Sequence, residues 1–305
     1  MYIKVNIKIV ILFLVGGLNV FAQDFELFKI ESTYYPMQNI EESDLNREIG
    51  FWEWSAKLTI PQLLKNEKSL LLHQLRYTNL RAEMEGNLLS GPTEATKTYH
   101  TMSYGLSWIE TLNPKWQLVV NVLPTLASDL EGALSGDDFL FLANAIAIRT
   151  KNSRFKYGFG LAYTTSFGRQ LVIPMGMLKY RTNTTAIDLL LPNKLSVIFH
   201  INKPFNYGLQ ARLDGGLFNN NSTVQIINEE VDATSYSRLN IGPVMTYKLN
   251  DFLKIDLEGG MAVGRRLTFI DSNDDTFNRT PENGLFFKVG LSISPKKKNK
   301  NAPKD

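Results

Sequence analysis

The chain has 305 residues, no cysteine and three histidines, His73, His100 and His200, that lie far apart in the sequence. The absence of cysteine excludes a disulfide framework and any cysteine-based zinc or redox site, and we expect no cofactor. The formal charge of +3 comes from the two ends of the chain. Removing residues 1–22 and 295–305 leaves 26 basic against 29 acidic residues, a balance that does not indicate a nucleic-acid partner.

Residues 1–22 have the pattern of a secretory signal peptide. Lys4 and Lys8 form a positive start, residues 9–20 are apolar, and Ala22 ends a stretch with small residues at the positions a signal peptidase reads. The apolar run is shorter than the roughly 20 residues that a membrane-spanning helix needs. We therefore predict export with cleavage after Ala22.

Residues 195–214 carry the clearest structural pattern in the chain. Apolar side chains stand at every second position up to residue 201 and again from residue 205, with polar side chains between them. Side chains alternate faces along a strand, so this pattern predicts two strands, each with one apolar and one polar face. A three-residue loop at 202–204 keeps paired residues on one face and sets His200 opposite Asn206.

The same alternation recurs along most of the chain, and no stretch shows a sustained helical period. Counting all such segments predicts 14 strands, or 12 if the short segment at 185–191 and a neighbouring segment do not form strands. The regular segments are 52–60, 116–122, 155–164, 239–247, 253–258 and 285–293, and the less regular ones are 25–35, 69–80, 98–109, 139–150, 171–180 and 185–191.

The connections between these segments alternate in length, with short turns on one side of the predicted sheet and mostly long loops on the other. That layout is typical of outer-membrane barrels, whose turns lie in the periplasm. We therefore predict an all-β, antiparallel up-and-down transmembrane β-barrel of 12–14 strands over residues 23–294, followed by a basic disordered tail at 295–305. The predicted long polar loops are 36–49, 81–97, 127–138, 217–235 and 265–283.

Alternation alone does not distinguish a membrane barrel from a soluble β-sandwich or barrel, because both show a period of two. Three features favour lipid contact. Polar faces carry charge or glycine along whole strands, aromatic residues such as Trp108, Trp116 and Tyr247 stand near strand ends, and strands of about 9–11 residues match a tilted membrane crossing.

Residues 175–180 form a glycine-bearing strand that ends in tyrosine, and residues 186–192 read Ala-Ile-Asp-Leu-Leu-Leu-Pro. In these features the chain resembles the bacterial outer-membrane β-barrel class over residues 23–294, and most resembles single-chain barrels known only as domains of unknown function. The resemblance implies outer-membrane lipid and the barrel-assembly machinery as partners, and no active site. Barrels of this class usually end on an aromatic residue, whereas Ile293 precedes Ser294 here, so either an internal assembly signal or another insertion route is implied.

The polar faces provide the candidate functional residues. In a narrow barrel their charges pair into a network that fills the interior, and in a wider one they line a pore and bias ion selectivity. Their mixed signs favour a structural network over a selectivity filter. The residues expected to line the lumen are Glu53, Lys57, Lys156, His200, Gln210, Arg212, Asp214, Lys254, Asp256, Glu258 and Lys288.

A membrane-embedded lipid hydrolase would need a histidine within hydrogen-bond reach of a serine and an orienting polar group. Ser196 stands on the same face as His200 but too far along the strand for direct contact. His100 and Ser103 point to opposite faces. We expect His200 to line the lumen and His100 to lie at most at an interface.

Two further features are compatible with ligand binding, but each has a simpler explanation. Asp271, Asn273, Asp275 and Glu282 occupy positions 1, 3, 5 and 12 of a calcium-loop pattern, but Thr276 replaces the required glycine and no helices flank the loop. We expect a solvated acidic loop.

The lysine-rich tail could contact anionic headgroups, but its composition favours disorder.

We therefore expect a monomeric, non-catalytic outer-membrane barrel that acts as a small pore, a solute or lipid conduit, or a structural component of the envelope. The first alternative is a membrane-embedded lipid-modifying enzyme that uses His200 or His100. The second is a secreted soluble β-protein whose apolar faces form a core.

Overall fold

The computed structural model describes residues 25–41, 47–66, 68–88, 91–221, 231–271, 273 and 275–295. The predicted signal peptide and all but the first residue of the predicted basic tail lie outside these ranges. Within them, no helix is long and apolar enough to cross a membrane.

The described chain folds into β-strands and one short 3₁₀ helix, η1. The strands are β1 (Phe28–Asn39), β2 (Glu48–Leu63), β3 (Ser69–Leu88), β4 (Gly91–Asn113), β5 (Trp116–Ser128), β6 (Phe139–Thr150), β7 (Phe155–Thr164), β8 (Leu171–Arg181), β9 (Thr185–Leu191), β10 (Lys194–His200), β11 (Phe205–Asn219), β12 (Ala233–Lys248), β13 (Leu253–Ile270), β14 (Thr276–Asn278) and β15 (Gly284–Ile293), and η1 is Gly136–Asp138.

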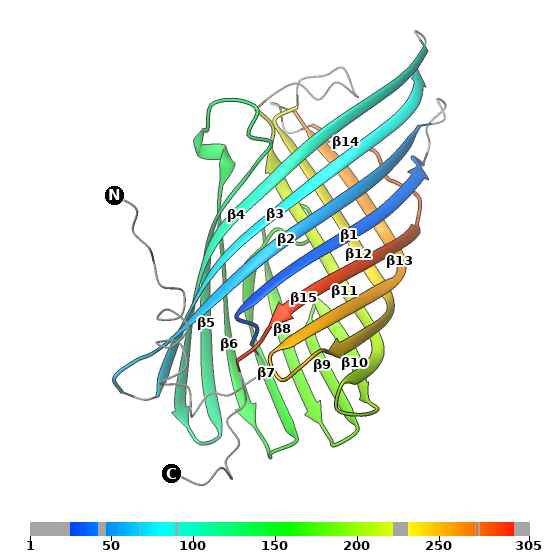
Figure 1. The fold of residues 1–305 in the computed structure, drawn as a ribbon. Helices are drawn as coiled ribbons and strands as arrows, with labels where there is room; N and C mark the ends of the chain where they lie inside the picture. Colours follow the sequence, from blue (N-terminus) through cyan, green and yellow to red (C-terminus); the bar gives the residue numbers. More distant parts are fainter. Residues whose placement is uncertain are drawn as a thin grey trace, which may run out of the picture.

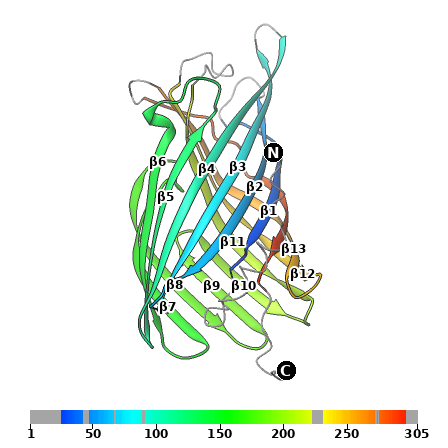
Figure 2. The ribbon, with the colours of Figure 1, turned by 60° about the vertical axis from the view of Figure 1, so that its left-hand side comes forward.

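The strands form one sheet that closes on itself (Figures 1 and 2). Each strand from β1 to β13 pairs with its neighbours in the chain, and β15 pairs with both β13 and β1. β14 pairs with β13 alone, over three residues. The other strands make a closed, antiparallel barrel of 14 strands, so the predicted up-and-down barrel is confirmed.

The best-defined predicted hairpin, β10 and β11, has the expected register. His200 lies opposite Asn206 and Phe199 opposite Tyr207, and the backbone N–H of Ile201 donates to the carbonyl of Phe205 across the three-residue turn. A loop with an odd number of residues keeps paired side chains on the same face of the sheet. The alternation of apolar and polar residues was therefore enough to predict which residues pair.

The apolar faces point outward all round the barrel. Leu209 is 63% and Phe159 62% exposed, whereas the alternate residues Ser196 and Gln210 are 2% and 8% exposed. The soluble alternative required the apolar faces to form a core, and instead they cover the outside. The outer wall therefore has the surface of a barrel surrounded by lipid.

The predicted long loop at 81–97 is wrong, because the strands on both sides continue into it. Residues 81–88 and 91–97 form the upper parts of β3 and β4, which stay paired as far as Leu88 and Gly91 and rise above the other strands (Figure 1). Outward side chains there are polar, as in the ion pair between Arg81 and Glu83 at 2.8 Å. Because the outward residues of this stretch are polar, it lacks the alternation of apolar and polar residues that marks a lipid-facing strand. The stretch was therefore predicted to be a loop.

Inward-facing glycines mark places where the wall admits no side chain. A Cβ atom on Gly242 would lie 1.9 Å from the carbonyl oxygen of Gly259, and one on Gly160 would lie 2.0 Å from that of Ala145. Both clashes are with backbone of the neighbouring strand, which cannot move without opening the sheet. These glycines allow neighbouring strands to approach closely where the barrel curves.

We predict that Gly242→Ala destabilises the barrel by about 1–3 kcal/mol, the usual effect of overpacking. The matched control is Gly176→Ala in β8, where the nearest atoms would lie 3.9 Å from the new Cβ. The measurement is the fraction of protein that migrates as the compact, heat-modifiable band after refolding in detergent. Equal fractions for the two variants would contradict this explanation of the glycine.

Candidate functional site

The candidate site is the barrel lumen, which has two chemically different halves. All the residues predicted to line the lumen lie on the inward face, on the side of each strand opposite the exposed apolar residues. They gather in the half nearer the short turns. The half nearer the long loops is filled by apolar side chains that the sequence did not reveal as a group.

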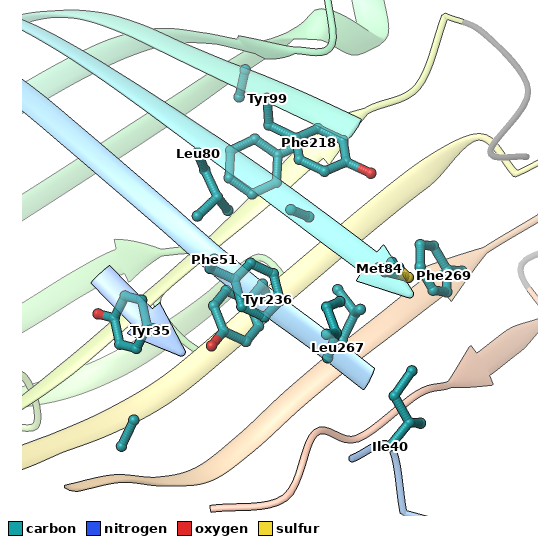
Figure 3. Close-up of a cluster of buried hydrophobic side chains, with 14 of the residues drawn as sticks. Tyr35, Ile40, Phe51, Leu80, Met84, Tyr99, Phe218, Tyr236, Leu267 and Phe269 are labelled. Carbon is teal, nitrogen blue, oxygen red and sulfur yellow. The ribbon is translucent and has the colours of Figure 1, made fainter. Parts of the chain in front are cut away.

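The apolar half is a packed core inside the barrel (Figure 3). β7 to β10 contribute none of its described members. Several members fall in stretches that the sequence assigned to loops, where a continuing period of two was the available signal. The buried residues are Tyr35, Ile40, Ile49, Phe51, Leu80, Ala82, Met84, Tyr99, Ala127, Leu140, Phe218, Val231, Tyr236, Ala262, Leu267, Phe269 and Phe286.

Two stacked ring pairs show that this core reaches across the barrel. The rings of Phe51 in β2 and Tyr236 in β12 have centroids 4.1 Å apart, and those of Tyr99 in β4 and Phe218 in β11 are 4.8 Å apart. Six strands separate β4 from β11 in either direction around the ring. Side chains from opposite walls therefore meet at this point.

A buried arginine marks the boundary between the two halves. Arg238 is 3% exposed, and its guanidinium lies over the rings of Tyr35 and Tyr236 at 4.7 and 4.8 Å. It forms an ion pair with Glu53 and donates from Nε to the hydroxyl of Tyr35 at 2.7 Å. Cation–π contacts and a carboxylate together compensate the desolvation of this charge.

The ends of β5 and β11 meet in what we term the clamp, made of Ser128, Asp129, Asp138, Asn219 and Asn221. Asn219 pairs with Ser128 in a parallel bridge, and the backbone N–H of Asp129 donates to the carbonyl of Asn219 at 3.1 Å. The backbone N–H of Asn221 donates to both carboxylate oxygens of Asp129 at 3.0 Å. The clamp joins β5 to β11 directly, so that only nine strands surround the long-loop half of the lumen. These strands are β11 to β13, β15 and β1 to β5.

Asp138 is the buried centre of the clamp. Its side chain is fully buried and accepts hydrogen bonds from Nδ2 of Asn221 at 2.8 Å and from Nδ2 of Asn219 at 3.1 Å. The backbone N–H of Ser135 donates to it at 2.6 Å. Burial alone would raise the pKa of Asp138, but these donors and the Ser128 hydroxyl outweigh burial and lower the pKa to about 2.

The charged half contains a network of ion pairs of both signs. Glu31 bridges Lys29 at 2.9 Å and Lys288 at 2.6 Å, while Arg212 pairs with Asp214 at 2.7 Å. Among the predicted lumen residues, Lys57 and Lys254 contact Glu26, a carboxylate that precedes β1, at 3.6 and 2.8 Å.

The histidines make hydrogen bonds that give no catalytic arrangement. His200 Nδ1 lies 2.7 Å from Asn206 Oδ1 in the lumen, and His100 Nδ1 lies 2.8 Å from the hydroxyl of Tyr77 on the outer wall. His73 is likewise outward and contacts Tyr104 at 2.7 Å. None of these described hydrogen bonds joins a histidine to a serine or a carboxylate.

The acidic loop does not gather its four candidate ligands. Asp271 Oδ1 accepts the backbone N–H groups of Asn273 at 2.9 Å and Asp275 at 2.8 Å, which occupies it within its own turn. Glu282 instead accepts a hydrogen bond from Asn39 at 3.4 Å. Over the residues that the structure describes, no group of three or more acidic or histidine side chains could hold a metal ion.

Comparison with known proteins gives a family and a set of similar barrels. A family model described as a domain of unknown function, DUF6268, matches residues 66–294, as the resemblance to uncharacterised barrels predicted. A sequence comparison with curated proteins found no match.

Solved structures with a similar fold include porins, channels and autotransporter domains. The NanC porin is 10% identical, with 87% of this chain and 98% of that chain covered and a TM-score of 0.39. An outer membrane channel from Pseudomonas putida F1 is 9% identical, with 91% and 98% covered and a TM-score of 0.41. The β domain of a Bordetella autotransporter is 8% identical, with 88% and 100% covered and a TM-score of 0.37. Likenesses this distant carry no argument about function.

We predict that the clamp loosens in acid. Because the pKa of Asp138 is lowered from 3.8 to about 2, its contribution to stability is complete above about pH 4 and is lost as the pH falls toward 2. A pKa that folding lowers by one pH unit corresponds to about 1.4 kcal/mol of stability, so the contribution of Asp138 is about 2 kcal/mol. Thermal unfolding in detergent, followed by circular dichroism from pH 6 to pH 2, measures it.

The variant Asp138→Asn should be less stable than the wild type at pH 6 and should lose less stability in acid. Its matched control is Asp137→Asn, which removes an exposed neighbouring carboxylate and should leave both values unchanged. An identical acid dependence in the wild type and Asp138→Asn would show that the clamp carboxylate does not carry this stability.

Proposed function

Because the chain belongs to the DUF6268 family, a family described as of unknown function, we propose its function from the geometry of the barrel. We propose that it is an outer-membrane β-barrel that is closed to ions, and that it serves as a structural component of the envelope rather than as an open pore. The observation that carries this proposal is the contact between opposite walls at Tyr99 and Phe218.

The outer wall supports the membrane location. Its exposed side chains are large and apolar, as with Val172 at 68% and Phe287 at 56% exposed. Burying such surface in lipid is favourable by about 25 cal/mol per Å². The short turns lie at the end where β1 begins and β15 ends (Figure 1), which we place in the periplasm, with insertion by the barrel-assembly machinery as a monomer.

The inner wall supports closure. Ions cross a membrane protein along a hydrated path, and an apolar constriction without water excludes them. In the long-loop half, the two ring stacks and the clamp occupy the interior from wall to wall. The charged half thus lies toward the periplasmic end and is bounded by the buried Arg238.

A second candidate function is a conduit that opens when the clamp separates. The observation that favours it is the abundance of charged side chains in the other half, because charged groups can line the path of a polar solute. We assign no catalytic role to His100 or His200, because their described partners, Tyr77 and Asn206, are not those of a nucleophile.

Conductance across a planar lipid bilayer tests closure. We expect the wild-type protein to insert without a steady ionic current, because the apolar core blocks the path. The double variant Tyr99→Ala with Phe218→Ala removes the stack that joins opposite walls and should produce discrete current steps. The control double variant Phe159→Ala with Phe287→Ala removes two rings from the outer wall and should remain silent.

A steady current through the wild-type barrel would contradict the proposal and favour the conduit. The same silence in both double variants would show that the ring stack is not what closes the lumen. Heat-modifiable mobility of each variant confirms that the barrel has folded before the recording.

A further inference from the structure

Positive side chains stand in a row on the lumen wall of the charged half. Lys29 lies directly opposite Lys57, and Lys57 lies directly opposite Arg76. On the other side, Ser292 lies between Lys29 and Lys254. We term Lys254, Lys29, Lys57 and Arg76 the basic row. Like charges directly opposite one another destabilise a sheet, so this arrangement is costly unless an anion lies against it.

Two carboxylates of the chain already lie against part of the row: Glu31 contacts Lys29 at 2.9 Å, and Glu26 contacts three members of the row. Glu26 precedes β1, and its carboxylate oxygens lie 2.8 Å from Nζ of Lys254, 3.6 Å from that of Lys57 and 3.8 Å from that of Lys29. Its side chain is 17% exposed. Glu26 therefore shows that a carboxylate fits between these lysines. It reaches them from the short-turn end of the barrel, where it precedes β1.

The far end of the row has no such partner. Within the described chain, no carboxylate oxygen lies within 4.0 Å of the guanidinium of Arg76. Its hydrogen bond goes to the neutral Gln74, at 2.5 Å, and the residue is exposed to the lumen. Across the lumen, Lys194 is also without a carboxylate in that range and lies directly opposite Arg212 in the sheet. Arg76 and Lys194 are thus two inward cations that form no ion pair with a carboxylate of the described chain.

A second observation comes from the middle of the row. Ser292 is fully buried, and its hydroxyl has no hydrogen-bond partner among the described residues. It lies between Lys29 and Lys254, on the face where Glu26 binds. A buried hydroxyl without a partner costs free energy, and an anion that displaced Glu26 would supply the missing acceptor.

We propose that the basic row is a binding site for a small anion with two or more carboxylate or phosphate groups that enters from the short-turn end. The lysines supply the point charges and Arg76 supplies a planar fork that suits both oxyanions. Lys29 and Lys254 are the second residues of their strands, so the site lies close to the entrance. Glu26 competes for it as a tethered carboxylate.

Calorimetric titration of the full chain in detergent tests the proposal, with pyrophosphate and citrate as probes. We expect saturable binding of one probe or both, and the comparison between them assigns the site to phosphate or to carboxylate. Glu26→Gln removes the competing carboxylate and should tighten binding about tenfold, whereas Arg76→Gln should weaken it about tenfold, the effect of one hydrogen bond to a charged group.

The matched control is Lys156→Gln in β7. Lys156 is also an inward lysine and lies opposite another lysine, Lys179, but it is outside the row and has no counterpart of Glu26. Its replacement should leave the affinity unchanged in protein shown to be folded by heat-modifiable mobility. The proposal is overturned if neither probe binds the wild type or Glu26→Gln, if Glu26→Gln does not tighten binding, or if Lys156→Gln weakens binding as much as Arg76→Gln.

Discussion

The contact between the ends of β5 and β11 divides the barrel into two halves of different chemistry. Below it, the 14 barrel strands surround a lumen whose inward side chains are mostly polar and charged. Above it, the bridge between Ser128 and Asn219 closes a narrower ring, and a lumen that narrow can be filled by side chains alone. The aromatic core, the ring stacks and the buried Arg238 all depend on that narrowing.

The narrowing itself follows from strand length. β9 and β10 have seven residues each, whereas β11 has 15. The pairing of β11 with β10 ends at Arg212, and its remaining residues have no β10 partner. An unpaired strand edge must satisfy its backbone groups elsewhere, and β11 does so at Asn193, where Leu213 donates at 2.9 Å, and at the end of β5. Because β9 and β10 are short, the sheet ends early on that side, and the ends of β5 and β11 can contact each other beyond it.

Local periodicity was enough to predict the barrel, the register of the β10–β11 hairpin and the inward direction of the charged side chains, because each depends on neighbouring residues only. It did not predict the core. Met84, Phe218 and Phe269 are buried members of the core, but polar residues such as Glu83, Asn219 and Thr268 stand beside them, so the stretches looked like polar loops. The sequence also could not show that Tyr99 meets Phe218, since a period of two does not specify what lies across the lumen.

The most direct test of this account is a disulfide between β5 and β11. The chain contains no cysteine, so Ser128→Cys with Asn219→Cys creates a single pair, whose positions are bridge partners within reach of a disulfide. If the barrel closes as described, oxidation of intact outer membranes should link the pair efficiently while the folded, heat-modifiable band is retained. A control pair, Ser128→Cys with Asn152→Cys at the opposite end, should not link. Failure of the first pair to link in folded protein would contradict the division of the lumen into a packed half and a charged half.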